Sequence, residues 1–331
     1  MTMNESAVRS TGNDALRTKH SMVERGYMKD DFVKYFVGTT SDKKRRASPL
    51  INRGTRASRK RRRSSSFTKQ DSGTFARTFA IETATREFLE VIEEKKGQII
   101  NLGAGSSTLF WRLKSDKAIE SSRVTFYEVD FKDTVHAKRR IIESRSELSS
   151  LSKVGYVLVS ADLRDMKGVQ KRLEGEGNLR ADLPTLLISE CTLMYLPPKE
   201  SSAVIEWAND FFSSELAFVT YEPFRPEDKY GSMMMKNFGE RGCGLMTMKE
   251  FPTLESQKAR YEKRGFTDVR VCDMIRVFNL HLDQTVIRPV LRLEMFDEFE
   301  EWNLIQSHYC FVLALRGRLT RSFEFMKKKK K

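Results

Sequence analysis

The sequence lacks the long apolar runs of membrane proteins and the dense cysteines of small secreted proteins. Among its 331 residues there is no run of 18 or more apolar residues, and the N-terminus is polar. We therefore expect no membrane span, no secretory signal and an intracellular location. The four cysteines, Cys191, Cys243, Cys272 and Cys310, form no Cys-x-x-Cys pair. This spacing argues against a disulfide framework and against a zinc site, and favours buried thiols.

Histidine is also scarce. The four histidines, His20, His136, His281 and His308, are scattered along the chain. They have neither the spacing of metal ligands nor a paired nucleophile. The sequence therefore predicts no metal centre.

Acidic residues are missing from one long stretch, and this explains the net charge of +14. Residues 43–69 contain twelve Lys and Arg and no Asp or Glu, and residues 327–331 add five Lys. These seventeen charges exceed the net charge, so the rest of the chain carries about −3. The tract Arg59–Ser66 is a candidate nuclear-import signal, phosphorylatable segment or RNA-contacting arm, or simply a solvated insertion. The basic character belongs to one segment and one tail.

The most informative stretch is the apolar run Gln98–Leu102, which ends at Gly103-Ala104-Gly105. Such a run is typical of a buried parallel strand, and the glycines let a ligand approach the backbone. A second run ends on Asp130, about two dozen residues later, where a carboxylate can accept both hydroxyls of a ribose. With two glycines, the turn suits S-adenosylmethionine better than a dinucleotide with its pyrophosphate. A tight turn without a ligand is the alternative.

From residue 98 onward, strand and helix patterns alternate, which predicts an α/β fold with a mainly parallel sheet covered on both faces. The predicted strands are 98–103, 123–130, 155–161, 184–190, 216–222, 267–275 and 308–316. The predicted helices between them include 132–143, 199–212, 254–264 and 294–304.

Ahead of the sheet, the sequence predicts a disordered segment over 1–12 and two short helices, at 13–23 and 30–37, that form a helical cover. Residues 56–74 are expected to be a basic, disordered insertion, after which a helix follows. The main domain is then predicted over 13–325, with a Lys-rich tail over 326–331.

The chain also contains seven short sequence words in order: Ile51–Gly54, Asn101–Gly105, Phe110–Leu113, Tyr127–Phe131, Ala161–Asp165, Leu183–Cys191 and Leu254–Lys258. Together they resemble the leucine carboxyl methyltransferases, which methyl-esterify the C-terminal leucine of the protein phosphatase 2A catalytic subunit. No single word is decisive, but the ordered set is specific. The resemblance implies a class I S-adenosylmethionine-dependent methyltransferase with a Rossmann-like, mainly parallel seven-stranded sheet.

The resemblance also implies roles on the adenosine side of the cofactor. Gly103 would give the cofactor room beside the backbone, and Asp130 would hold the ribose hydroxyls. Asp162 and Leu163 would flank the adenine, the acid taking the exocyclic amine while the leucine packs on the ring. An acid after a strand also commonly caps the next helix, which is the alternative role for Asp130, Asp162 and Glu190.

On the methionine side, the resemblance places Glu190 near the ammonium group and the basic pair Lys19 and Arg77 at the carboxylate. Arg77 would also face the acceptor carboxylate, and Tyr195 would line the acceptor pocket. Surface cations are the alternative interpretation of Lys19 and Arg77. A C-terminal carboxylate, with a pKa of about 3.5, is already ionised, so methyl transfer to it needs no general base. Catalysis would rest on holding the carboxylate in line with the methyl group.

The sequence departs from the family at one point. In the relatives, the word matching Ile51–Gly54 runs almost directly into the segment that here begins at Phe75, so residues 56–74 separate the two. The assignment of Arg77 assumes that these residues loop out.

Two other functions fit parts of the sequence. One is a tRNA wybutosine-type carboxyl methyltransferase; those relatives carry a kelch-type propeller, whereas this chain ends 15 residues past its last predicted strand. The other is a catalytically silent protein that binds nucleic acid through the basic tract, against which the intact glycine and acid positions argue. We expect instead a monomeric enzyme that acts on the phosphatase and regulates its holoenzyme assembly, without membrane or nucleic-acid partners. Its expected location is cytoplasmic, with a nuclear pool if the basic tract is an import signal.

Overall fold

The computed structural model describes residues 4–37, 56–93, 95–120, 122–293 and 299–327, with the backbone alone described over 56–70 and at 299. The sequence word Ile51–Gly54 lies outside these residues. Within the described part of the chain, no helix is long and apolar enough to cross a membrane.

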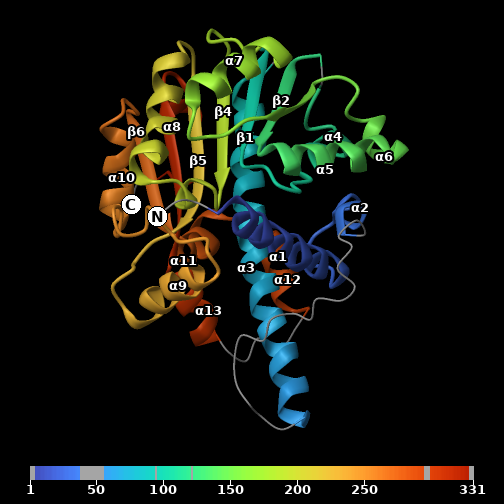
Figure 1. Cartoon of the computed structure of the whole chain (residues 1–331), viewed down its shortest axis with the longest axis vertical. Helices are drawn as coiled ribbons and strands as arrows, with labels where there is room; N and C mark the ends of the chain where they lie inside the picture. Colours follow the sequence, from blue (N-terminus) through green and yellow to red (C-terminus); the bar gives the residue numbers. More distant parts are fainter. Residues whose placement is uncertain (1–3, 38–55, 94, 121, 294–298, 328–331) are drawn as a thin grey trace.

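A sheet of seven strands forms the centre of the molecule, as predicted (Figure 1). The order is β3-β2-β1-β4-β5-β7-β6; β1 to β5 pair in parallel, and β7 runs antiparallel to β5 and β6. Each strand lies within two residues of its predicted bounds, because each is a short apolar run that ends at a glycine or a polar residue. The strands are β1 (Gly97–Leu102), β2 (Val124–Asp130), β3 (Tyr156–Ser160), β4 (Thr185–Glu190), β5 (Leu216–Pro223), β6 (Asp268–Asp273) and β7 (Tyr309–Arg316).

Helices cover both faces of this sheet (Figure 1). Those before β3 are α1 (Glu5–Glu24), α2 (Val33–Val37), α3 (Arg56–Val91), α4 (Leu109–Ser115), α5 (Lys132–Glu143) and α6 (Ser146–Ser149). Those between β3 and β6 are α7 (Met166–Gly177), the 3-10 turn η1 (Leu193–Tyr195), α8 (Pro198–Phe211), α9 (Lys229–Glu240) and α10 (Leu254–Glu262). The last are α11 (Met274–Arg276), the π-helical turn η2 (Val277–His281), α12 (Gln284–Leu291), α13 (Phe299–Gln306) and α14 (Leu319–Ser322).

Two apolar cores lie on opposite faces of the sheet. In β1, Ile99 belongs to one core and Ile100 to the other, since successive strand residues point to opposite faces. The first core includes residues of α1, α3, α4 and α5, and the second includes residues of α7, α8 and α10. Burial on both faces explains the mainly apolar sequences of inner strands such as β1, β5 and β7, whereas the edge strand β6 begins with alternating polar and apolar residues.

The strand order reverses between β1 and β4, so the crevice of the fold lies at the carboxyl ends of these strands. Gly103 follows β1, Asp130 ends β2 and Glu190 ends β4. Parallel pairing brings these three positions to the same edge of the sheet.

The prediction of a disordered segment over 1–12 is wrong for its described residues. Helix α1 begins at Glu5, and the side chain of Asn4 caps it by accepting a hydrogen bond from the Ala7 backbone N–H at 3.2 Å. Asparagine is a preferred N-cap and an acid in the first turn complements the helix dipole, so these polar residues start a helix. The helical cover itself is confirmed, with α1 packed on α3.

The expected disordered insertion over 56–74 also differs from the structure, because α3 runs without a break from Arg56 to Val91. The stretch contains no proline and several good helix formers, so it continues the following helix. Its first turns extend away from the sheet (Figure 1). The last residues of the stretch 56–74 are packed inside the fold. Asp71 is fully buried, accepts a hydrogen bond from Ser21 Oγ at 2.9 Å and lies 3.2 Å from Arg25 Nε.

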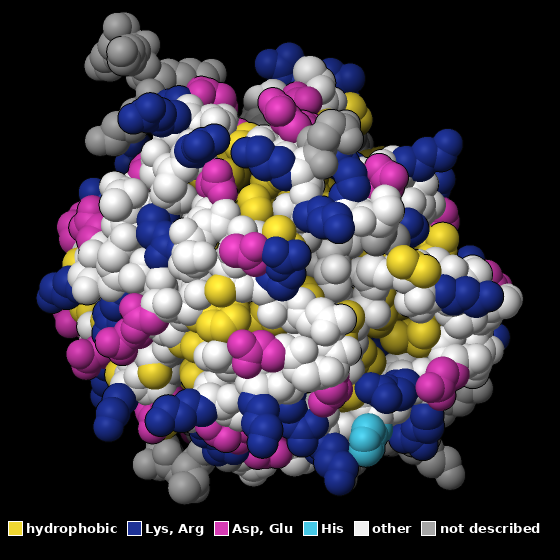
Figure 2. All heavy atoms as spheres, turned by 90° about the horizontal axis from the view of Figure 1, so that it is seen from above, with side chains coloured by type: hydrophobic (Ala, Val, Ile, Leu, Met, Phe, Trp, Pro, Cys, Tyr) yellow, Lys and Arg dark blue, Asp and Glu magenta, His cyan; other side chains and the backbone are white. Residues whose placement is uncertain are grey.

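The C-terminal boundary lies later than predicted. Met326 is buried and belongs to the same core as Phe323 and Phe325, so the fold includes the first residue of the expected tail. On the face shown in Figure 2, basic and acidic side chains are interspersed, as expected for a body whose net charge is close to zero.

Candidate functional site

A cavity of about 360 Å³ opens at the carboxyl ends of β1, β2 and β4, beneath the N-terminal half of α1. Seven of the eight residues with predicted roles line it: Lys19, Arg77, Gly103, Asp130, Leu163, Glu190 and Tyr195. The cavity also borders Phe238 and Arg241, at the end of α9. The sheet, the helical cover and α9 therefore all contribute to one site.

The glycine turn after β1 shapes one wall of the cavity. Gly103 has a φ of +65°, and a Cβ there would lie 2.4 Å from Thr192. Gly105 has a φ of +50°, but a Cβ there would meet no atom within 4 Å. Both conformations favour glycine. Gly103 is required by packing against Thr192, whereas Gly105 keeps space free beside the cavity.

Asp130 lies directly beside this turn. Its Oδ2 accepts a hydrogen bond from the Gly105 backbone N–H at 2.7 Å, and its Oδ1 accepts one from the Phe131 backbone N–H at 2.7 Å. Burial raises the pKa of Asp130, although these two N–H groups counteract the effect. A carboxylate oxygen has two lone pairs, so each can still accept a ligand hydroxyl.

Lys19 reaches the cavity from α1. Its Nζ donates a hydrogen bond to Thr108 Oγ1 at 2.6 Å and lies 3.3 Å from Asp30 Oδ2. Burial, with the nearby cation of Arg112, lowers the pKa of Lys19 to about 8. The predicted basic residue is thus a buried amine that can change its charge near neutral pH.

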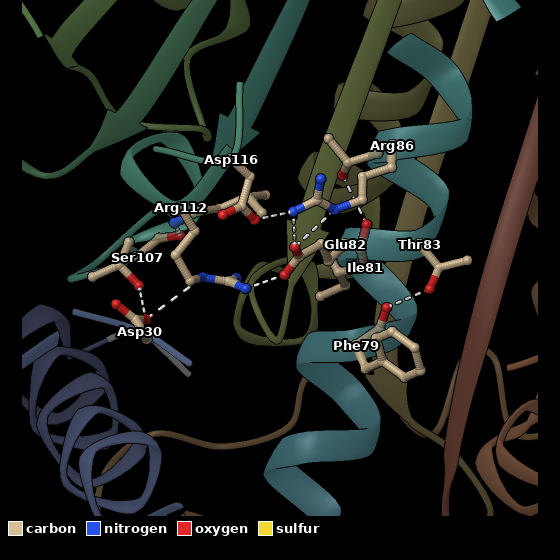
Figure 3. A network of polar contacts seen from close by, with 12 residues as sticks. Asp30, Phe79, Ile81, Glu82, Thr83, Arg86, Ser107, Arg112 and Asp116 are labelled. Atoms are coloured by element: carbon tan, nitrogen blue, oxygen red, sulfur yellow. Dashed lines mark hydrogen bonds and ion pairs between the residues drawn. The ribbon is translucent and has the colours of Figure 1, made fainter. Parts of the chain in front are cut away.

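Arg112 extends between Asp30 and Glu82 and joins the segment before α2 to α3 (Figure 3). Burial alone would raise the pKa values of both acids, but the facing cations lower them on balance. No pairing of these residues was predicted from the sequence. A signal existed, because Arg112 stands in the apolar run Phe110–Leu113, and a charge in such a run requires a buried partner.

Arg77 projects from α3 to the end of β4. Its Nε lies 2.5 Å from Glu190 Oε1, and its guanidinium lies 5.6 Å from the ring centroid of Tyr221. Tyr221 stacks on Tyr309, with ring centroids 5.1 Å apart. Burial disfavours the charge of Arg77, but the Glu190 carboxylate more than offsets this and raises its pKa. The predicted pair Arg77 and Glu190 is therefore one half-buried ion pair.

Of the last two residues with predicted roles, Tyr195 lines the cavity and Asp162 does not. Tyr195 is buried, and its hydroxyl donates a hydrogen bond to Thr11 Oγ1 at 3.2 Å. Burial raises its pKa, so the phenol stays protonated. Asp162 Oδ2 lies 2.5 Å from Arg164 Nη2, and a remaining lone pair of the carboxylate can still accept a ligand N–H.

The family model of the leucine carboxyl methyltransferases matches residues 7–209. The leucine carboxyl methyltransferase 1 homolog of Arabidopsis thaliana is 32% identical, over 96% of this chain and 91% of that protein. Leucine carboxyl methyltransferase 1 of Caenorhabditis elegans is 33% identical, over 93% and 91%. The chain belongs to the leucine carboxyl methyltransferase family.

A further relative is the human tRNA wybutosine-synthesizing protein 4, 32% identical over 94% of this chain but only 44% of that protein. Among solved structures, a Thermobifida fusca protein assigned to the methyltransferases has a TM-score of 0.51 and 13% identity, over 79% of this chain and 88% of that one. A DUF574-family protein from Streptomyces avermitilis has a TM-score of 0.51 and 11% identity, over 80% and 93%. These structures show the fold alone.

As a leucine carboxyl methyltransferase, the chain is an enzyme that uses S-adenosylmethionine. The cavity fits this cofactor in one observable respect: the space kept free at Gly105 adjoins a buried carboxylate, Asp130, at the carboxyl end of β2. Within the described residues, no three His, Cys, Asp or Glu side chains are grouped so as to hold a metal ion.

Substitution of the two glycines of the turn should have different effects on stability and on cofactor binding. We expect Gly103→Ala to lower the free energy of unfolding by roughly 1–3 kcal/mol, since it combines a left-handed backbone with the contact to Thr192. Gly105→Ala should cost less stability but weaken S-adenosylmethionine binding, because its methyl group enters the free space. Urea unfolding and calorimetric titration measure the two effects. Gly175→Ala, on α7 and away from the cavity, is the control, and unchanged binding by Gly105→Ala would contradict the interpretation.

Proposed function

We propose that this enzyme methyl-esterifies the C-terminal leucine α-carboxylate of the protein phosphatase 2A catalytic subunit. The observation that carries the proposal is Arg77, a largely enclosed cation beside Glu190 in the cavity that also contains the glycine turn. A guanidinium is the side chain best suited to orient a carboxylate through two parallel hydrogen bonds. Membership of the family supports the leucine carboxylate as the acceptor.

The adenosine half of the cofactor would lie at the first three strands. Asp130 would accept the ribose hydroxyls, Gly103 and Gly105 would leave room beside them, and Leu163 would pack on the adenine. Leu163 supports this role by being buried at the cavity wall. Asp162 would take the exocyclic amine with a lone pair that Arg164 does not occupy.

The methionine half would lie between the sheet and the helical cover. Glu190 would face the ammonium group, and Lys19 would face the carboxylate, because each charge attracts its opposite in a buried cavity. Arg77 would then orient the acceptor carboxylate, with Tyr195 lining the acceptor side. S-adenosylmethionine supplies a methyl group that is electrophilic without further activation.

Catalysis would depend on position and not on proton transfer. The acceptor carboxylate is ionised at neutral pH, and none of the cavity-lining residues is a histidine. Tyr195 stays a neutral phenol and does not serve as a base. The cavity would act by holding one carboxylate oxygen about 3 Å from the methyl carbon, and its apolar walls would keep water away.

The alternative is methyl transfer to a tRNA carboxyl group. The similarity to the human tRNA wybutosine-synthesizing protein 4 favours it, since that protein matches over 94% of this chain. Both acceptors present a carboxylate, so the geometry around Arg77 suits either. The basic tract Arg59–Ser66 is the segment through which RNA would bind, and such binding would weaken with added salt.

The acceptor can be tested directly. We expect purified enzyme with methyl-labelled S-adenosylmethionine to label the phosphatase catalytic subunit but not the same subunit without its terminal leucine. Mild base should release the label, as it hydrolyses a methyl ester. Label on unmodified or precursor tRNA in a parallel reaction, with none on the phosphatase, would establish the alternative.

A substitution at Arg77 tests its proposed role. Arg77→Lys keeps the charge but loses the planar pair of donors, so we expect turnover on the phosphatase to fall roughly 10- to 100-fold. Arg86→Lys on the same helix, outside the cavity, is the matched control and should retain activity. Wild-type kinetics for Arg77→Lys would mean that another cation orients the acceptor.

The lowered pKa of Lys19 predicts a pH dependence of cofactor binding. The protonated amine attracts the methionine carboxylate, so affinity should be highest below the pKa of about 8 and fall as the pH rises through it. Calorimetric titrations at several pH values between pH 7 and 9 measure the change. The variant Lys19→Met should bind the cofactor more weakly, and its affinity should not fall between pH 7 and 9 because of residue 19. Any fall that remains in this variant comes from titration of the cofactor's own amine. Parallel pH profiles for both proteins would refute the role.

A further inference from the structure

A buried ion pair lies behind the wall that carries Tyr195. Glu222 of β5 and Arg260 of α10 are both fully buried, and Arg260 Nη1 lies 3.1 Å from Glu222 Oε2. Arg260 Nη2 also donates a hydrogen bond to Ser201 Oγ of α8 at 2.5 Å, and its guanidinium lies 4.5 Å from the ring centroid of Phe251. Neither charged residue lines the cavity.

The pair is linked to the turn η1 by two routes. Ser201 Oγ donates a hydrogen bond to the carbonyl oxygen of Leu193 at 2.9 Å. The backbone N–H groups of Leu193 and Met194 face the Glu222 carboxylate and help to lower its pKa, which burial raises on balance. The Leu193 carbonyl is therefore linked to Arg260 through Ser201, and the N–H groups of Leu193 and Met194 lie close to the Glu222 carboxylate.

The turn matters because of what it carries into the cavity. Met194 and Tyr195 both line the cavity, and Thr192, the residue before η1, packs against Gly103. A three-residue 3-10 turn has few internal hydrogen bonds to hold it, so its position is set by external partners. A shift of about 1 Å at a reacting centre can reduce the rate about 100-fold.

Fold stability alone gives a poor reason for burying these two charges. Replacing a buried ion pair with apolar residues of similar volume is often neutral or stabilising. An ion pair has one property that apolar residues lack, because its charged groups can fix the direction of backbone N–H and hydroxyl groups around it. Arg260 lies two residues after the sequence word Leu254–Lys258. Although α10 does not line the cavity, Arg260 links it to the site through Ser201 and Leu193.

We propose that Glu222 and Arg260 are positioning residues that hold η1, and through it Met194 and Tyr195, in place on the acceptor side of the cavity. The proposal rests on the proposed function in assigning η1 to the acceptor side. Most of the cofactor side is built from other elements, since Lys19 comes from α1 and Asp130 from β2. Loss of the pair should therefore impair use of the protein acceptor and leave cofactor affinity unchanged.

The decisive variant removes both charges together. Single substitutions leave one buried charge without its partner and can unfold the protein, so the double variant Glu222→Leu, Arg260→Met is the main test. Circular dichroism and thermal unfolding verify its fold. Lys258→Met, which breaks the exposed ion pair with Glu262 on the same helix, is the matched control.

We expect the folded double variant to bind S-adenosylmethionine within twofold of wild type, while kcat/KM for the phosphatase falls roughly 10- to 100-fold. Hydrogen exchange at the backbone amides of Leu193 and Met194 should become faster, and the control should change neither quantity. A double variant with wild-type kcat/KM and wild-type exchange at these amides overturns the proposal. Faster exchange with wild-type kcat/KM also overturns it, because the turn would then be held without consequence for the acceptor.

Two further measurements keep the test independent of folding and of the acceptor. If the double variant does not fold, Ser201→Ala removes only the link from Arg260 to Leu193, and it should lower kcat/KM with unchanged cofactor affinity. If wild-type enzyme does not methylate the phosphatase, the proposed function fails, and the exchange rates of Leu193 and Met194 then decide the positioning role alone. Unchanged exchange in that case refutes it.

Discussion

The ion pair between Arg77 and Glu190 joins α3 to the sheet at the centre of the site, with 2.5 Å between Nε and Oε1. Either charge alone would be costly in this partly enclosed place. Helices α1 and α3 contribute the cations Lys19 and Arg77, and the carboxyl ends of the strands contribute the acids Asp130 and Glu190. The charges of the cavity are therefore balanced only when α1 and α3 are docked on the sheet, which couples formation of the site to completion of the fold.

Three buried charge clusters surround this cavity, and each is attached to a different part of its wall. Arg112 connects the segment before α2 with α3, and Arg260 connects α10 with the turn η1 through Ser201. Lys138 lies 2.5 Å from Glu128 Oε2 and donates a hydrogen bond at 2.8 Å to the carbonyl oxygen of Ser107, two residues after the glycine turn. Such clusters contribute little net stability, but they specify where the loops around the cavity lie.

Family membership establishes the class of reaction, whereas the choice of acceptor depends on the mouth of the cavity. There the helical cover meets α9: Arg241 Nη2 lies 2.6 Å from Asp14 Oδ2, and Phe238 borders the opening. The relatives include leucine carboxyl methyltransferases and a tRNA wybutosine-synthesizing protein at similar identity. The two proposed acceptors both present a carboxylate, so we expect the residues around the mouth, more than those beside the cofactor, to distinguish a protein tail from a nucleic acid.

The sequence by itself determined the seven strands, the mainly parallel sheet and the residues at the strand ends, including Gly103, Asp130 and Glu190. Those features are local: an apolar run and the residue that ends it specify a buried strand and its carboxyl end. The N-cap Asn4, which starts α1, is also a local signal, but the polar composition of the first residues favoured a prediction of disorder. Only the tertiary structure decided which charges pair. Asp162 faces Arg164 and not the cavity, and the partners of Arg112 and Arg260 are distant in the sequence. Buried charges take whichever partner packing brings within reach, and packing depends on contacts that no local pattern contains.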